Sequence, residues 1–173
     1  MSDTSAKHAS LVRRSLVGGV ALLSAGLGLS LPLSCQAASP AALPSTDSLP
    51  ASLAKALAVH QPLVVMASLP HCPFCNVVRQ SYLQPLQAAG LPVVQIDMRD
   101  SRALVDFDGT PMTQDAWVRL RKVKVAPTVM FFGAQGKEIA ARLNGAYLPD
   151  FYNSYLEEQL AVARAVVQRA NNS

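Results

Sequence analysis

Cys72 and Cys75 stand directly behind a short apolar run, and this junction constrains the fold more than any other part of the sequence. The run, Leu-Val-Val-Met-Ala at residues 63–67, is typical of a strand buried on both faces. Residues 73–89 have the pattern of a helix, and Pro73 is tolerated in its first turn, where backbone N–H groups have no partner. The cysteines are therefore expected where a buried strand ends and a helix begins, which predicts an α/β fold.

A thiol at the start of a helix faces unpaired backbone N–H groups and the positive end of the helix dipole. Both favour the thiolate, which is the nucleophilic form of cysteine. The spacing Cys-Pro-Phe-Cys also brings the second sulfur within disulfide distance of the first. We therefore predict that Cys72 and Cys75 are catalytic residues that form a redox disulfide. In this scheme Cys72 attacks a substrate disulfide and Cys75 resolves the mixed disulfide.

Other uses of a closely spaced cysteine pair fit the sequence less well. Zinc needs four ligands, and no second Cys or His pair at metal-ligand spacing accompanies this one, because His60 and His71 are isolated. A purely structural disulfide that closes so short a loop would remove little chain entropy. Haem attachment requires a histidine after the second cysteine, where this chain has Asn76. We predict no metal and no cofactor.

The start of the chain has the three parts of a secretory signal peptide. Residues 1–14 are polar and net basic, residues 16–33 carry no charge, and small residues follow at 35–38. A retained membrane anchor is the alternative, but four glycines and Pro32 dilute an apolar stretch of 18 residues that barely reaches the length of a span. We predict that residues 1–38 are a cleaved signal peptide and that the protein is exported to the periplasm.

Two alternatives on export stay open: a twin-arginine signal, because of Arg13 and Arg14, and lipidation of Cys35. Cleavage after Ala37 or Ala38 would remove Cys35 and leave two cysteines. Export and an even cysteine count both point to an oxidising compartment.

Composition excludes some classes of protein. Half of the 173 residues are apolar and 15% are charged, which is not the composition of a disordered chain. Beyond the first 14 residues there are 12 basic and 10 acidic residues, too even a balance for a nucleic-acid-binding surface. We predict a monomer that does not bind nucleic acid.

The exported part is expected to be one domain, residues 50–173, behind a tether at residues 39–49 that is rich in Pro, Ala and Ser. Strands joined through a helix should lie parallel, and a closing hairpin at residues 133–136 should be antiparallel. These rules predict one mixed central sheet of about four strands with helices on both faces.

The individual elements follow from periodicity and from turn residues. A polar segment at residues 99–112 carries the turn signal Asp108-Gly109. The expected helices are residues 50–60, 73–89 with a bend at Pro85, 113–123 and a last helix from Pro149, and the expected strands are residues 63–67, 93–97, 128–132 and 137–143. The last helix has an apolar stripe made of Tyr152, Leu156, Leu160, Ala163 and Val167.

Over roughly residues 50–165 the chain resembles the thioredoxin superfamily. The resemblance is carried by the Cys-x-x-Cys junction, by Val-Ala-Pro-Thr at residues 125–128, by the hairpin and by Gly145. It implies a thioredoxin fold with a cis-proline at Pro127 beside the cysteines and a helical insertion before that proline. It also implies that protein thiols and disulfides are the substrates. Four residues are then expected to contact substrate: His71, Phe74, Ala126 and Pro127.

Within the superfamily the chain is most similar to exported bacterial thioredoxin-like proteins, including those of the SoxW type. Residues 106–109, the helix with Trp117, and residues 142–145 followed by Phe151 carry this likeness. It implies a periplasmic thiol:disulfide oxidoreductase that acts on envelope proteins and depends on a membrane or periplasmic redox partner. The alternative is a non-catalytic thioredoxin-fold protein that handles a metal or a partner's thiols.

The chain departs from thioredoxin near the cysteines. Thioredoxin has a buried acid and a lysine that serve the second cysteine, and Met66 and Val93 stand at those positions here. Proton transfer from Cys75 is therefore expected to depend on water. His71 replaces a tryptophan and is either a cation that stabilises the thiolate or an inert loop residue. Phe74 is either a contact for the substrate or a lid over Cys75.

Overall fold

The computed structural model describes residues 42–146 and 149–172, which include both cysteines of the pair. The predicted signal peptide at residues 1–38, with Cys35, lies outside the described residues. In the part of the chain that is described, no helix is both long and apolar enough to cross a membrane.

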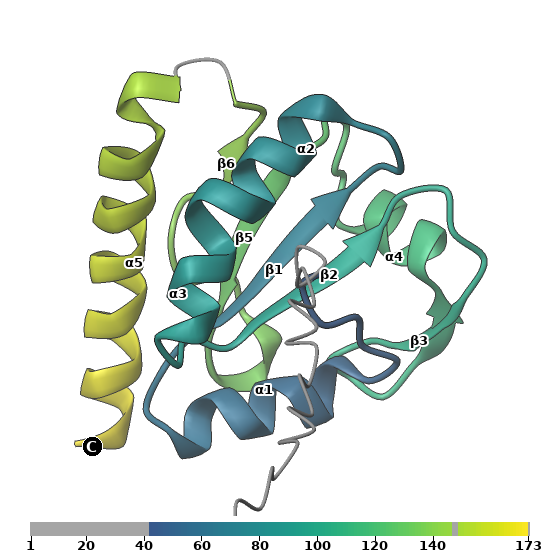
Figure 1. Cartoon of the computed structure of the whole chain (residues 1–173). Helices are drawn as coiled ribbons and strands as arrows, with labels where there is room; N and C mark the ends of the chain where they lie inside the picture. The colour runs from purple at the N-terminus through teal and green to yellow at the C-terminus, as the bar shows by residue number, and fades with distance from the viewer. Residues whose placement is uncertain (1–41, 147–148, 173) are drawn as a thin grey trace, which may run out of the picture. The chain divides into compact units, whose positions relative to one another are not determined.

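The domain is built on a four-stranded sheet with the strand order β2-β1-β5-β6 (Figure 1). The strands are β1 (Leu63–Ser68), β2 (Val93–Asp97), β5 (Thr128–Phe132) and β6 (Leu143–Asn144). β1 and β2 are parallel, β5 is antiparallel to β1, and β6 is antiparallel to β5. The predicted mixed sheet of about four strands is confirmed.

The direction of β5 corrects one prediction. A helix joins β2 to β5, so these two strands were expected to be parallel. However, β2 pairs with β1 in parallel and β5 pairs with β1 antiparallel, so β2 and β5 run in opposite directions. The connection contains a hairpin, β3 (Ala103–Val105) and β4 (Pro111–Thr113), as well as helix α4 (Gln114–Leu120). β5 therefore begins at the end of the sheet where β2 stops, so the rule for parallel strands joined through one helix does not hold for this longer connection.

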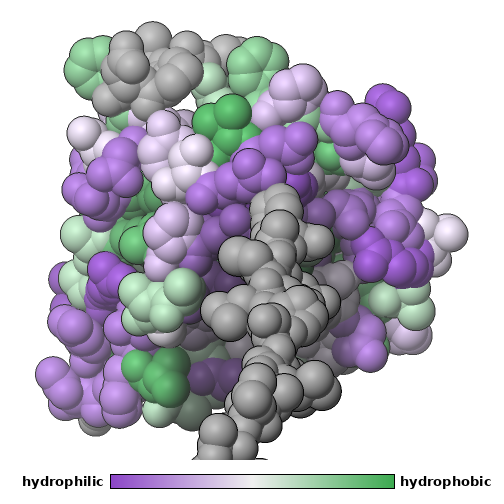
Figure 2. Space-filling model, in the orientation of Figure 1, coloured by the Kyte–Doolittle hydropathy of each residue, from purple (hydrophilic) through white to green (hydrophobic). Residues whose placement is uncertain are grey.

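Helices cover both faces of the sheet, as predicted (Figure 1). One face is covered by α1 (Leu49–Ala58) and α4. The other face is covered by α2 (Pro73–Val77), the π-helical segment η1 (Val78–Leu83), α3 (Gln84–Ala88) and α5 (Pro149–Asn171). Hydrophilic side chains dominate the side of the molecule in Figure 2, with hydrophobic ones scattered among them.

Strand β1 is buried along its whole length, as its apolar run predicts. Successive side chains of a strand point to opposite faces of the sheet. Val64 and Met66 accordingly join the core under α2 and α5, whereas Val65 and Ala67 join the core under α1 and α4. The chain therefore leaves β1 and enters α2 from a strand that is packed on both faces of the sheet.

Helical residues run from Pro73 to Ala88 without a break, and the irregularity predicted at Pro85 is a π turn in front of it. A proline inside a helix has no N–H, and its ring presses on the carbonyl group four residues back. In η1 the hydrogen bonds widen, so that the Gln84 N–H reaches the carbonyl oxygen of Arg79. The wider turn makes room for the proline ring.

Residues 43–48 do not form part of a free tether. The Gln95 N–H donates to the carbonyl oxygen of Pro44 at 2.8 Å, and the Val105 N–H donates to that of Asp47 at 2.8 Å. The tether prediction is wrong for this segment, because its carbonyl groups accept hydrogen bonds from the otherwise unpaired edge of β2 and from β3.

The β3–β4 hairpin was predicted only as a turn. Its strands have three residues each, and the Gly109 N–H donates to the carbonyl oxygen of Asp106 at 2.9 Å in the connection. Thr113 then caps α4 by accepting the Ala116 N–H at 3.1 Å, as the predicted capped helix requires. This segment is the helical insertion expected before the cis-proline.

The last strand is shorter than the predicted residues 137–143. An isolated bridge joins Phe132 to Glu138, and regular pairing resumes with Val129 opposite Leu143. Between these two pairs β5 advances by three residues and the opposite chain by five, so the opposite chain bulges. The predicted alternation of Ile139, Ala141 and Leu143 is thereby interrupted.

The final helix agrees with its predicted apolar stripe. All five stripe residues are buried. Four of them belong to the core cluster against the sheet and α2: Tyr152, Leu156, Leu160 and Ala163.

Candidate redox site

Cys72 is the N-cap residue of α2, and Pro73 is in the first turn of that helix. The Cys72 sulfur accepts the backbone N–H of Cys75 at 3.2 Å, and the Cys72 carbonyl oxygen accepts the N–H of Asn76 at 3.1 Å. The predicted junction of strand and helix is therefore present, with the first sulfur on the helix terminus. A sulfur that accepts a backbone N–H is stabilised as a thiolate.

The two cysteines differ in exposure. Cys72 is half-buried, whereas Cys75 is fully buried in the core cluster that also holds Val78 and Tyr152. Both are free thiols, and the redox disulfide between them remains a prediction. An outside sulfur can reach Cys72, whereas Cys75 can react only with a group already attached nearby.

Burial raises the pKa of the Cys75 thiol, because a thiolate in the core loses its hydration. The hydrogen bond with the Cys72 side chain raises the Cys75 pKa further. Hydrogen bonds with the Leu69 backbone and with the Ser68 side chain act in the opposite direction and lower it. Cys75 therefore rests as a neutral thiol with two contacts that favour its ionised form.

The Ala126–Pro127 peptide bond is cis, as the resemblance implied. Ala126 and Cys72 both pack against the core cluster that contains Cys75. Pro127 is buried, and its carbonyl oxygen accepts the Gly145 N–H at 2.7 Å. The structure thus places Ala126 on the core cluster that contains Cys75 and holds the Pro127 turn against the end of β6.

Phe74 is 60% exposed, so it does not cover Cys75 and the lid interpretation is wrong. Val77 and Val125 are also exposed apolar side chains, on the first turn after Cys75 and just before Ala126. His71 is exposed and has a positive φ of 57°, which turns the chain from β1 into α2.

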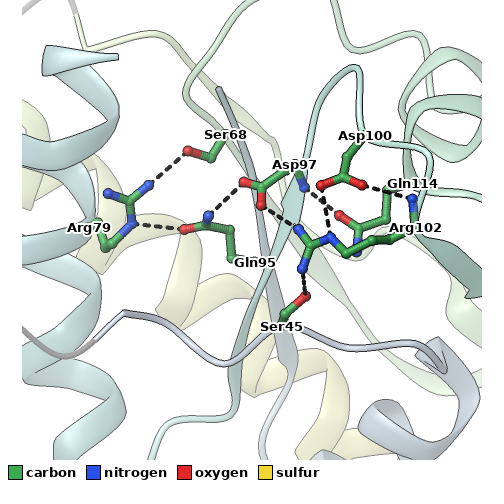
Figure 3. Close-up of polar contacts among 8 residues, drawn as sticks. All are labelled: Ser45, Ser68, Arg79, Gln95, Asp97, Asp100, Arg102 and Gln114. Atoms are coloured by element: carbon green, nitrogen blue, oxygen red, sulfur yellow. Dashed lines mark hydrogen bonds and ion pairs between the residues drawn. The ribbon is translucent and has the colours of Figure 1, made fainter. Parts of the chain in front are cut away.

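Met66 and Val93 lie in the same core cluster as Cys75, so apolar side chains do occupy this face of β1 and β2. Sequence reasoning missed two polar residues next to them, Ser68 and Arg79, which are joined by a hydrogen bond of 2.9 Å (Figure 3). The signal for Ser68 was its position two residues after Met66, which places both side chains on one face of β1.

Among residues 42–146 and 149–172, no group of three or more His, Cys, Asp or Glu side chains is arranged to hold a metal ion.

Comparison with known proteins gives one family. The sequence model described as "Thioredoxin-like domain" matches residues 49–160, which include the cysteine pair and the cis-proline. No curated protein sequence matches the chain.

Solved structures with a similar chain trace include two thioredoxins and the DsbH oxidoreductase. Mitochondrial thioredoxin 3 from Saccharomyces cerevisiae is 18% identical, with 69% of this chain and 93% of that chain covered and a TM-score of 0.45. The DsbH oxidoreductase is 20% identical, with 71% and 88% covered and a TM-score of 0.49. The periplasmic thioredoxin SoxS from Paracoccus pantotrophus is 19% identical, with 60% and 99% covered and a TM-score of 0.38.

The family match covers well over half of the chain, and the sheet order, the flanking helices and the cis-proline agree with it. This chain belongs to the thioredoxin-like domain family.

Proposed function

We propose that this protein is a thiol:disulfide oxidoreductase that works through the Cys72–Cys75 pair. The observation that carries the proposal is the unequal exposure of two adjacent thiols. Cys72 is accessible and its sulfur accepts a backbone N–H, whereas Cys75 is fully buried one helical turn later. This arrangement separates an attacking thiolate from a resolving thiol.

The reaction consists of two exchanges. The Cys72 thiolate attacks one sulfur of a substrate disulfide, so a mixed disulfide forms and the other substrate sulfur leaves as a thiolate. Cys75 then attacks the Cys72 sulfur, which forms the Cys72–Cys75 disulfide and releases the second substrate sulfur. The Cys75 proton ends on that departing sulfur, and the substrate has gained two electrons. The reverse sequence oxidises a substrate dithiol.

The accessible sulfur is surrounded by groups suited to an extended polypeptide. Phe74 offers an exposed apolar ring, His71 an exposed polar side chain, and Ala126 a small side chain that packs against the same core cluster as Cys72. Together with Pro127 these residues form the proposed contact surface for substrate. A half-buried sulfur flanked by an exposed apolar ring suits an extended protein segment as substrate.

We place the reaction in the periplasm and propose residues 1–38 as the signal peptide, because of their basic, apolar and small-residue parts. Envelope proteins are then the proposed substrates, and a membrane or periplasmic protein restores the redox state of the pair. The proposed subfamily is the exported SoxW type, on the likeness at residues 106–109 and 142–145.

The test uses the full chain with Cys35→Ser, so that only the pair can react. Catalysed reduction of a protein disulfide by dithiothreitol is measured for this protein and for its Cys72→Ala and Cys75→Ser variants. We expect Cys72→Ala to abolish catalysis while the thermal unfolding transition stays in place. Full activity of Cys72→Ala would contradict the proposal.

Trapping in cells separates an enzyme from a passive binder. With Cys75→Ser the mixed disulfide cannot be resolved, so complexes with envelope proteins should accumulate and should disappear on reduction. A non-catalytic thioredoxin-fold protein would give no such complexes. The matched control is the variant that carries Cys72→Ala as well.

A further inference from the structure

Ser68 connects the buried cysteine to a charged side chain. It is the last residue of β1, it is fully buried, and its side chain hydrogen-bonds with Cys75. Its Oγ atom also accepts a hydrogen bond of 2.9 Å from Nη2 of Arg79 (Figure 3). A hydroxyl whose oxygen accepts from a guanidinium keeps its own hydrogen available, so Ser68 can donate it to the Cys75 sulfur.

Arg79 is held entirely by neutral oxygens. Besides Ser68 Oγ, its guanidinium donates to Oδ1 of Asn76 at 2.6 Å and to Oε1 of Gln95 at 2.8 Å. Gln95 is oriented in turn by Asp97, whose Oδ1 accepts its Nε2–H at 2.7 Å (Figure 3). Within the described residues no carboxylate pairs with Arg79, so its charge is not neutralised by contact.

We infer that Ser68 and Arg79 are positioning residues for the resolving step; this inference rests on the proposed function. When Cys75 loses its proton, the Ser68 hydroxyl donates to the new thiolate, and Arg79 polarises that hydroxyl. A neutral hydroxyl backed by a cation thus assists Cys75 on a sheet face where Met66 and Val93 offer only apolar contacts. The bonds made and broken are those of the second exchange: the Cys72–Cys75 disulfide forms, the mixed disulfide breaks, and the proton ends on the departing sulfur.

The effect should fall on one step only. Ser68 contacts Cys75, and the first exchange uses Cys72, so removing the hydroxyl should leave the first exchange unchanged. A hydrogen bond to a charged group changes an equilibrium constant by about ten- to a hundredfold. A thiolate of lower pKa is more abundant but less nucleophilic, so the rate of attack changes by roughly the square root of the change in the equilibrium constant. Resolution should therefore slow by about three- to tenfold near neutral pH.

The experiment follows both steps in one stopped-flow trace. The reduced full chain with Cys35→Ser is mixed with an aromatic disulfide that releases a coloured thiolate in each exchange. The first release reports attack by Cys72 and the second reports resolution by Cys75. The variants are Ser68→Ala, Arg79→Gln and Ser68→Thr. Arg119→Gln is the matched control, because α4 lies on the opposite face of the sheet.

We expect Ser68→Ala and Arg79→Gln to slow the second release alone, Ser68→Thr to restore it, and Arg119→Gln to leave both releases unchanged. The pH midpoint of the second release should also move upward in Ser68→Ala. The other titratable groups that act on Cys75 are Cys72 and Tyr152, and both remain in every variant.

Two results would overturn the inference: a second release at the wild-type rate in Ser68→Ala, or equal slowing of both releases, which indicates general damage to the site. Failure of the proposed function looks different. In that case the first release is absent, or it persists in Cys72→Ala, whatever residue stands at position 68.

Discussion

The indole Nε1–H of Trp117 donates a hydrogen bond of 2.8 Å to Oδ1 of Asp106, and both side chains are buried. The same carboxylate oxygen accepts Nη2 of Arg121 at 2.7 Å, and the Arg121 guanidinium lies over the Trp117 and Phe107 rings. Asp106 therefore links the β3–β4 hairpin to α4 through buried hydrogen bonds.

Asp106→Ala should destabilise the protein by about 2–4 kcal/mol, because it leaves the Trp117 N–H and a largely buried Arg121 without their acceptor. Chemical denaturation at neutral pH measures this loss. Asp115→Ala is the control, since Asp115 pairs with the exposed Arg119 and should cost less than about 1 kcal/mol. Similar losses for the two variants would show that the buried hydrogen bonds of Asp106 contribute little to the free energy of unfolding.

Gly136→Ala should be more damaging than Gly109→Ala. Both glycines have a positive φ, 66° and 88°, which disfavours any side chain. A Cβ at Gly136 would also overlap the Phe107 side chain, whereas a Cβ at Gly109 meets nothing within 4 Å. We expect unfolding free energies lower by about 2–5 kcal/mol for Gly136→Ala and about 1 kcal/mol for Gly109→Ala. Equal losses in a denaturation experiment would contradict the described contact with Phe107.

Stability of the reduced protein should fall at alkaline pH through Cys75. Burial raises the pKa of this thiol in the folded state, so above about pH 8.5 the unfolded chain releases the proton while the folded chain still binds it. The stabilisation is complete below the unfolded pKa and is lost as the pH rises through the folded one.

The free energy of unfolding, measured under reducing conditions between about pH 7 and pH 10, should therefore decline more steeply for the wild type than for Cys75→Ala. The variant keeps Tyr152, whose pKa is raised mainly by burial and least by Cys75, so the difference between the two curves reports mainly on Cys75 itself. Parallel curves would show that Cys75 titrates alike in the folded and unfolded chains.

Local patterns predicted those elements whose burial is regular along the chain. The apolar run of β1 and the stripe of α5 each followed from one periodicity, and both are buried as predicted. The Cys72 junction followed from the position of Pro73, because proline restricts where a helix can begin. These features depend on neighbours in sequence, so they are visible without the fold.

Features that depend on distant partners were missed. β3 has three residues, too few to show a period, and it exists because β4 pairs with it. The direction of β5 shows only in its antiparallel pairing with β1, which lies far away in the sequence. The contact of Ser68 with Arg79 requires the end of β1 to face η1, which no spacing in the sequence reveals. The tether prediction failed for the same reason, since residues 43–48 bond to an edge formed 50 residues later.

The most direct test of the assignment of Cys72 as attacking thiolate and Cys75 as resolving thiol is their rates of alkylation. The reduced full chain with Cys35→Ser is treated with iodoacetamide under native conditions, and modification at each cysteine is followed by peptide mass spectrometry. Cys72 is accessible and Cys75 is fully buried, so Cys72 should react more than about tenfold faster, and Cys75 should become reactive only in denaturant. Equal rates, or faster modification of Cys75, would contradict the account.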